Sequence, residues 1–151
     1  MLPPGRALDL AAGAGRNALY LASLGWSVVA VEASANAIEI LRLRSQAASG
    51  RIETRVADLE TDQFAIEPAT YDLICDFFYL QRDLFPKIRD GIRPGGVFSA
   101  EIHLRNGAGH QFVLEPGELR NEFSGWKILY YSESARSGHT RPTARIIARR
   151  A

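Results

Sequence analysis

A short apolar run that leads directly into two glycines constrains this chain more than any other feature. Residues 7–11 (ALDLA) have the length and composition of a buried strand, and Gly13 and Gly15 follow it. Because glycine has no Cβ, the backbone there can turn sharply and approach a ligand closely. Residues 16–24 carry apolar side chains at three- and four-residue spacing and stop at Gly25, which is typical of a helix. The segment therefore predicts a strand, a glycine loop and a helix.

Strand and helix patterns continue to alternate along two thirds of the chain. Further strands are predicted at residues 26–31, 52–57, 71–76 and 97–104, and helices at residues 34–50 and 77–92. Ser34 is the expected N-cap of the first of these helices, and Pro94, Gly95 and Gly96 are the expected turn before the last strand. Such alternation indicates parallel strands joined by right-handed helical crossovers. We expect a Rossmann-like, doubly wound α/β fold, with a mostly parallel sheet between two helical layers.

The last third of the chain has a different pattern. Residues 106–125 are loop-rich, with at most a short helix at residues 116–122. Two β-rich runs follow at residues 126–133 and 144–149, separated by a segment that contains glycine and proline. This arrangement predicts an antiparallel hairpin at one edge of the sheet.

Length and composition restrict the remaining possibilities. A chain of 151 residues, 46% of them hydrophobic, is long enough for one ordinary domain, so we expect a single domain over residues 1–151. The net charge of +1 provides no general attraction to nucleic acid, and the absence of a long apolar run or leader pattern predicts a cytoplasmic protein without a membrane segment. Cys75 is the single cysteine, and His103, His110 and His139 are not spaced as ligands, so no metal is expected.

Acidic residues fall at the predicted carboxyl ends of the first four strands, namely Asp9, Glu32, Asp58 and Asp76. In an open α/β sheet, ligands bind beyond these ends, where the strand order reverses. Glu32 ends the strand after the glycine loop, where a carboxylate can accept hydrogen bonds from both ribose hydroxyls. The pattern predicts a site for the adenosine part of a cofactor.

The glycine loop alone fits two cofactors. Residues 13–18 match the dinucleotide pattern G-x-G-x-x-A. However, a pyrophosphate on this loop would lie near Asp9, with Arg16 the one obvious cation, whereas a sulfonium cofactor with a free amino group favours a carboxylate there. The residues therefore favour S-adenosylmethionine, and a nicotinamide-dependent oxidoreductase stays open as the alternative.

Several segments resemble the motifs of one enzyme family. Residues 9–17 (DLAAGAGRN), 71–76 (YDLICD), 84–88 (LFPKI) and 93–97 (RPGGV) are similar to motifs of class I S-adenosylmethionine-dependent methyltransferases, and more narrowly of the small bacterial tellurite-resistance-type group. The resemblance extends over essentially the whole chain. It implies S-adenosylmethionine as cofactor, S-adenosylhomocysteine as product and a small-molecule methyl acceptor.

The resemblance also implies which residues bind the cofactor. It places Asp9, Gly13 and Gly15 around the methionine part, Glu32 on the ribose, Asp58 and Leu59 beside the adenine, and Asp76 with Phe77 near the methionine end. Ala11, Arg16, Asn17 and Ala33 complete the expected set.

The sequence departs from the family pattern in two places. Ala11 stands where the commonest motif has glycine, which adds a methyl group near the cofactor. In addition, the family usually has a lead-in of some tens of residues that helps to roof the site, whereas here the first predicted strand begins almost at Met1. Either the true start lies upstream, or a partner or second subunit, as in a homodimer, covers the site.

Two residues are our candidates for chemistry on the acceptor side. His103 ends a predicted strand, where a base would face the substrate, and Tyr79 follows another strand, where it and Arg82 would line the substrate pocket. A hydrogen-bonded surface histidine and a capping tyrosine are the alternatives. Methyl transfer from a sulfonium needs an in-line approach rather than a catalytic triad. We therefore expect a small-molecule methyltransferase, with a non-catalytic cofactor-binding module of the same fold as a second alternative.

Overall fold

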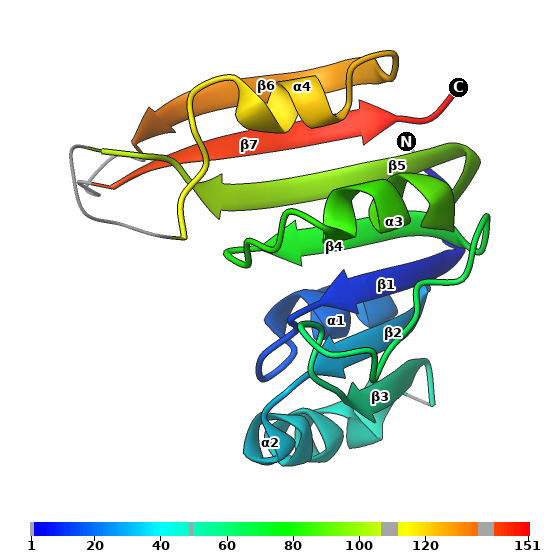
Figure 1. Cartoon of the computed structure of the whole chain (residues 1–151). Coiled ribbons are helices and arrows are strands. Elements are labelled where there is room, and N and C mark those ends of the chain that lie inside the picture. Colours follow the sequence, from blue (N-terminus) through cyan, green and yellow to red (C-terminus); the bar gives the residue numbers. More distant parts are fainter. Residues whose placement is uncertain (1, 49, 107–111, 136–140) are drawn as a thin grey trace.

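One mixed sheet forms the centre of the molecule (Figure 1). The structure, a computed structural model, describes residues 2–48, 50–106, 112–135 and 141–151. In sequence order the strands are β1 (Arg6–Leu10), β2 (Ser27–Glu32), β3 (Ile52–Val56), β4 (Tyr71–Phe77), β5 (Ile92–His103), β6 (Lys127–Ala135) and β7 (Pro142–Arg149). Their spatial order is β3-β2-β1-β4-β5-β7-β6, with β1 to β5 parallel and β7 antiparallel to both neighbours. The predicted sheet and its edge hairpin are confirmed.

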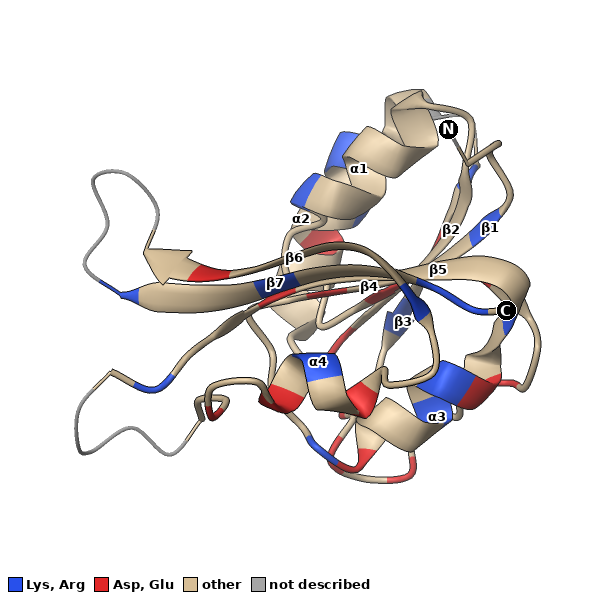
Figure 2. Ribbon diagram, turned by 90° about the horizontal axis from the view of Figure 1, so that it is seen from above, with Lys and Arg blue, Asp and Glu red and all other residues tan. Residues whose placement is uncertain are grey.

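Helices cover both faces of the sheet. They are α1 (Arg16–Ser23), α2 (Ala35–Ser45), α3 (Leu84–Gly91), α4 (Glu118–Glu122) and the short 3-10 helix η1 (Gln46–Ala48). Figure 2 shows α1 and α2 on one face and α3 and α4 on the other, which confirms the three layers. Ser34 caps α2 as expected, because its side chain accepts a 3.1 Å hydrogen bond from the backbone N–H of Ala37. In the described residues, no helix is both long and apolar enough to cross a membrane.

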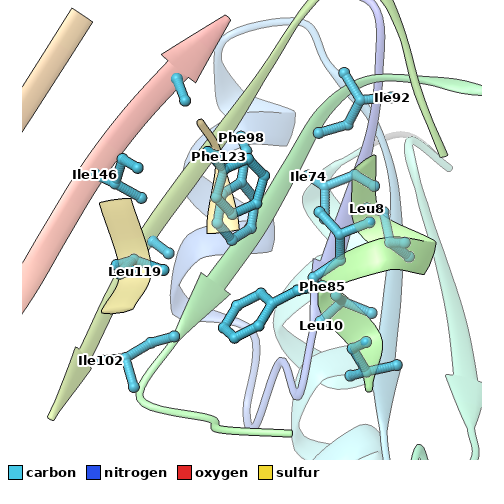
Figure 3. Packing of buried hydrophobic residues seen from close by; sticks show 14 of the residues in the cluster. Leu8, Leu10, Ile74, Phe85, Ile92, Phe98, Ile102, Leu119, Phe123 and Ile146 are labelled. Atoms are coloured by element: carbon cyan, nitrogen blue, oxygen red, sulfur yellow. The ribbon is translucent and has the colours of Figure 1, made fainter. Parts of the chain in front are cut away.

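Alternation along β1 divides the core between the two faces. Leu8 and Leu10 pack with Phe98 and Phe123 on the α3 and α4 face, where the two phenyl rings stack at a centroid distance of 4.5 Å (Figure 3). Ala7 faces the α1 and α2 side. Full burial of a leucine or phenylalanine side chain stabilises a fold by about 1.5–3 kcal/mol. These side chains therefore fix the register of β1 and hence the position of the loop that follows it.

The predicted helix over residues 77–92 is wrong in its first half and at its last residue. Phe77 still belongs to β4, Phe78 has a φ of 66°, and α3 occupies only Leu84–Gly91. Pro86 explains the late start, because a proline without an N–H fits only the first turn of a helix. The apolar spacing of residues 77–83 is typical of a helix, but residues 78–83 form the connection from β4 to α3.

The predicted turn at residues 94–96 lies inside a strand. β5 begins at Ile92, and its register with β4 shifts between Tyr71 and Leu73. The backbone N–H of Gly95 donates a 2.9 Å hydrogen bond to the carbonyl of Arg150. The Pro-Gly-Gly sequence therefore forms an irregular part of β5 near its start, and not a turn that precedes the strand.

Candidate cofactor site

The glycine loop between β1 and α1 turns through left-handed backbone conformations. Gly13 has a φ of 59° and Gly15 a φ of 86°, which residues with a Cβ rarely adopt. A Cβ at Gly13 would meet nothing within 4 Å, whereas a Cβ at Gly15 would lie 2.1 Å from Cδ1 of Leu41. Gly15 is therefore needed for the packing of the loop against α2, and Gly13 leaves open space beside the loop.

Glu32 holds the glycine loop against the end of β2. Its Oε1 accepts a 3.0 Å hydrogen bond from the backbone N–H of Gly13, and its Oε2 accepts one of 2.8 Å from the N–H of Ser34. Each carboxylate oxygen has a further lone pair, so the group can still accept hydrogen bonds from a ligand. The structure thus gives Glu32 a fixed orientation, as binding of two adjacent hydroxyls requires.

The segment after β3 is ordered by its own side chains and by the connection after β4. Asp58 Oδ1 accepts a 2.9 Å hydrogen bond from the backbone N–H of Glu60. Gln81 donates from Nε2 to the carbonyl of Leu59 at 2.9 Å and accepts from the Tyr79 hydroxyl at 2.7 Å. Sequence reasoning missed Gln81, because its partner Leu59 is far away in the chain and Gln81 carries no motif signal.

A cleft of about 310 Å³ brings these groups together. Its lining residues are Ala11, Glu32, Ala33, Ala57, Asp58, Leu59, Glu60 and Tyr79. Most of the residues predicted for the ribose and adenine therefore share one cleft at the carboxyl ends of the strands. Tyr79 was predicted for the acceptor side but lines this cleft, and burial together with nearby Glu60 raises its pKa to about 12.

Asp9 and Asp76 are buried carboxylic acids near the carboxyl ends of β1 and β4. Each is 2% exposed, and each accepts one backbone hydrogen bond, Asp9 from Ala18 and Asp76 from Tyr79. Among the described residues, Oδ2 of Asp9 and Oδ1 of Asp76 have no hydrogen-bond partner. Burial raises the pKa of Asp9 to about 7, and burial with the charge of Asp9 raises the pKa of Asp76 well above its usual range. Two buried acids of this kind favour a cationic ligand group.

Seven of the twelve predicted cofactor residues do not line the cleft, namely Asp9, Gly13, Gly15, Arg16, Asn17, Asp76 and Phe77. Asn17 and Phe77 line a larger cavity of about 400 Å³ on the α1 face, with Cys75 and Ile147 among its other lining residues. Arg16 is exposed at the start of α1. The larger cavity is lined mostly by apolar side chains, so it offers less to a polar cofactor than the smaller cleft does.

The acceptor-side candidates differ in their surroundings. The His103 ring lies beside the ring of Phe78, with centroids 5.1 Å apart and planes tilted by 41°. Arg82 is paired with Glu118 at 2.6 Å and donates to the Val113 carbonyl at 3.0 Å. Phe78 was missed because the sequence pattern assigned it to a helix.

A metal site finds no support in the part of the chain that the structure describes. No group of three or more His, Cys, Asp or Glu side chains there could hold an ion. His110 and His139, which the sequence analysis also considered, lie outside the described residues.

Comparisons with known proteins point to one family. The sequence model of the tellurite resistance protein TehB family matches residues 1–146. The chain is 25% identical, over 146 residues, to the probable S-adenosyl-L-methionine-dependent methyltransferase TehB of Haemophilus influenzae, covering 89% of this chain and 50% of that protein. The chain thus spans about half the length of the curated relatives it matches.

Solved structures show the same fold. The crystal structure of TehB from Haemophilus influenzae superposes with a TM-score of 0.83 at 22% identity, covering 98% of this chain and 58% of that one. The Burkholderia thailandensis 1,6-didemethyltoxoflavin-N1-methyltransferase, solved with bound 1,6-didemethyltoxoflavin and S-adenosylhomocysteine, gives a TM-score of 0.76 at 20% identity, covering 98% of this chain and 72% of that one.

Proposed function

The chain belongs to the TehB family, and we propose that it binds S-adenosylmethionine and transfers the methyl group to a small-molecule acceptor. The observation that carries the proposal is the presence of two buried acids, Asp9 and Asp76, on the strands that lead to Ala11 and Tyr79, which line a cleft together with Glu32 and Asp58. Membership of the family supports it, as does the S-adenosylhomocysteine in the Burkholderia structure.

Charge favours this cofactor over a dinucleotide. S-adenosylmethionine carries a positive sulfonium, a positive amino group and a negative carboxylate, hence a net positive charge, whereas a pyrophosphate is an anion. Two unit charges 4 Å apart interact by about 4 kcal/mol at the effective dielectric constant near a protein surface. Once ionised beside such a cation, Asp9 and Asp76 would therefore stabilise the first cofactor and repel the second.

The residues of the cleft divide the cofactor between them in this proposal. Glu32 accepts hydrogen bonds from the ribose hydroxyls, Asp58 and Leu59 lie beside the adenine, and Asp9 pairs with the amino group. Bound S-adenosylmethionine supplies an activated methyl group. The chain's own task is to orient the methyl carbon toward the acceptor and to exclude water, which needs no side-chain nucleophile.

Calorimetry with S-adenosylhomocysteine and NAD, followed by a homocysteine-release assay for turnover, tests the proposal. We expect binding of S-adenosylhomocysteine and none of NAD. Tight NAD binding without S-adenosylhomocysteine binding would favour the oxidoreductase alternative. S-adenosylhomocysteine binding with no turnover for any acceptor would favour a non-catalytic module. Size-exclusion chromatography with light scattering would test the alternative in which a homodimer covers the site.

A further inference from the structure

Gln81 joins the two chain connections that border the cofactor cleft. Its Nε2 donates a 2.9 Å hydrogen bond to the carbonyl of Leu59, and its Oε1 accepts one of 2.7 Å from the Tyr79 hydroxyl. Leu59 follows β3, Tyr79 follows β4, and both line the cleft. A single amide group therefore uses its donor on one connection and its acceptor on the other.

The contact with Leu59 determines which way the Gln81 amide faces. A backbone carbonyl can only accept a hydrogen bond, so the amide nitrogen must face Leu59 and the amide oxygen must face Tyr79. The Tyr79 hydroxyl has one hydrogen, and it donates this hydrogen to Gln81 Oε1. Toward a ligand in the cleft, the Tyr79 hydroxyl can therefore offer only the lone pairs of its oxygen.

The Tyr79 hydroxyl is also held in place and kept neutral. The Tyr79 ring packs against the core on the α3 and α4 face, which fixes its position. Burial, together with the nearby charges of Glu60 and Asp58, raises the pKa of Tyr79 to about 12, so the hydroxyl keeps its hydrogen at neutral pH. The cleft thus contains a fixed, uncharged acceptor whose direction depends on Gln81.

The other polar side chains that line the cleft are carboxyl groups, those of Glu32, Asp58 and Glu60. Ionised carboxyl groups also only accept hydrogen bonds, so a base that meets this lining must donate. The 6-amino group of adenine is a donor, whereas the 6-oxo group of hypoxanthine is an acceptor. An oxo group facing the Tyr79 oxygen would leave two acceptors without a hydrogen between them, which weakens binding.

We propose that Gln81 is a positioning residue for base selection, which makes the cleft prefer adenine to hypoxanthine because it holds the hydrogen of the Tyr79 hydroxyl. The inference rests on the proposed function. Gln81 does not line the cleft, so it acts through Tyr79 and not by contact with the ligand. A merely structural role of Gln81 would instead affect the binding of both bases alike.

Two ligands that differ only in the base test this inference. Calorimetry measures the dissociation constants of S-adenosylhomocysteine and S-inosylhomocysteine, and their ratio gives the preference for adenine. Tyr79→Phe removes the hydroxyl, and Gln81→Ala releases its hydrogen. Gln81→Glu keeps an acceptor for that hydrogen but loses the donor to Leu59. Gln63→Ala is the matched control, because Gln63 Oε1 accepts a 2.8 Å hydrogen bond from the Asp58 N–H and thus supports the same connection without Tyr79.

We expect the parent chain to bind S-adenosylhomocysteine at least about tenfold more tightly than S-inosylhomocysteine, as one hydrogen bond allows. This preference should fall about tenfold in Tyr79→Phe and in Gln81→Ala. It should stay unchanged in Gln81→Glu and Gln63→Ala, even where both ligands bind less tightly. Melting temperatures show whether each variant folds, and Tyr79→Phe decides the outcome if Gln81→Ala does not.

The results that would overturn the inference are distinct from those that would overturn the proposed function. If the parent chain binds S-adenosylhomocysteine without preference, or Tyr79→Phe or a folded Gln81→Ala keeps the full preference, the inference fails and the proposed function stands. Loss of the preference in Gln81→Glu or Gln63→Ala would assign it to support of the connection after β3, which also overturns the inference. Failure of the parent chain to bind S-adenosylhomocysteine would overturn both.

Discussion

The backbone N–H of Gly13 donates a 3.0 Å hydrogen bond to Oε1 of Glu32. This contact joins the two features from which the cofactor site was predicted, the glycine loop and the acidic end of the second strand. With the second hydrogen bond from Ser34, it fixes the carboxylate before any ligand arrives. Preorganisation of this kind lowers the entropic cost of binding.

Glu32→Gln should weaken S-adenosylhomocysteine binding at least about tenfold, or about 1.4 kcal/mol. The amide replaces one acceptor oxygen with a donor, so either the loop contact or a ribose contact is lost. Calorimetry measures the affinity. Glu39→Gln is the matched control, because Glu39 makes only an exposed ion pair with Arg42. Equal affinities for the parent chain and Glu32→Gln would contradict the assignment of Glu32 to the ribose.

Asp9→Asn should raise the melting temperature at pH 8 and weaken binding of S-adenosylhomocysteine. Burial raises the pKa of Asp9 from 3.8 to about 7, so between these values the folded chain keeps a proton that the unfolded chain loses. Stability from this group therefore falls as the pH rises from about 4 to about 7, by up to about 4 kcal/mol at 1.36 kcal/mol per pKa unit. The Asp9→Asn variant has no ionisable side chain at this position, so its stability does not fall for this reason.

Thermal melts at pH 4 and pH 8 check this prediction. The melting temperatures of the parent chain and the Asp9→Asn variant should differ more at pH 8 than at pH 4. In the parent chain, S-adenosylhomocysteine affinity should rise with pH as Asp9 ionises. Asp76 pairs in register with Leu10, the residue after Asp9, and its pKa is raised as well. Ionisation of Asp76 therefore changes stability and affinity in the same direction, so Asp9→Asn removes only part of their pH dependence. An unchanged pH profile in the variant would contradict burial of an ionisable Asp9.

Local signals in the sequence were sufficient to predict the secondary structure around the glycine loop and β2, which form one part of the candidate site. The glycine positions, the helix stop at Gly25 and the apolar run of β2 each act over a few residues, and the structure confirms the elements they predicted. Phe78 and Gln81 were missed for a physical reason. Their conformations depend on hydrogen bonds to Glu101 and Leu59, which are 22 or more residues away in the chain, and no local pattern reports such contacts.

Ala11→Gly should stabilise the chain and improve cofactor binding. Ala11 has a φ of 53° and lines the cleft, so its Cβ costs backbone strain and takes space that the commonest family motif leaves free. Relief of a left-handed conformation is worth about 1–2 kcal/mol, less the 0.5–1 kcal/mol of extra chain entropy that glycine loses on folding. A net gain of up to about 1.5 kcal/mol corresponds to a rise in melting temperature of up to about 3–6 °C.

Ala14→Gly is the control for this change, because Ala14 is not among the described non-glycine residues with positive φ. It should lower the melting temperature through chain entropy alone. Calorimetry with S-adenosylhomocysteine reports the cofactor effect separately. A lower melting temperature for Ala11→Gly would contradict the strained conformation of Ala11.

Gly15→Ala should destabilise the chain more than Gly13→Ala. Both positions have positive φ, so alanine costs about 1–2 kcal/mol at either. At Gly15 the new Cβ would also lie 2.1 Å from Cδ1 of Leu41, and overpacking of a core adds about 1–3 kcal/mol. Urea denaturation measures the difference. Leu41→Ala combined with Gly15→Ala should recover part of the overpacking loss but none of the strain, which makes the combined loss smaller than the sum of the single losses. Equal losses for the two glycine variants, or additive losses in the double variant, would show that Gly15 is needed for backbone conformation alone and not for contact with α2.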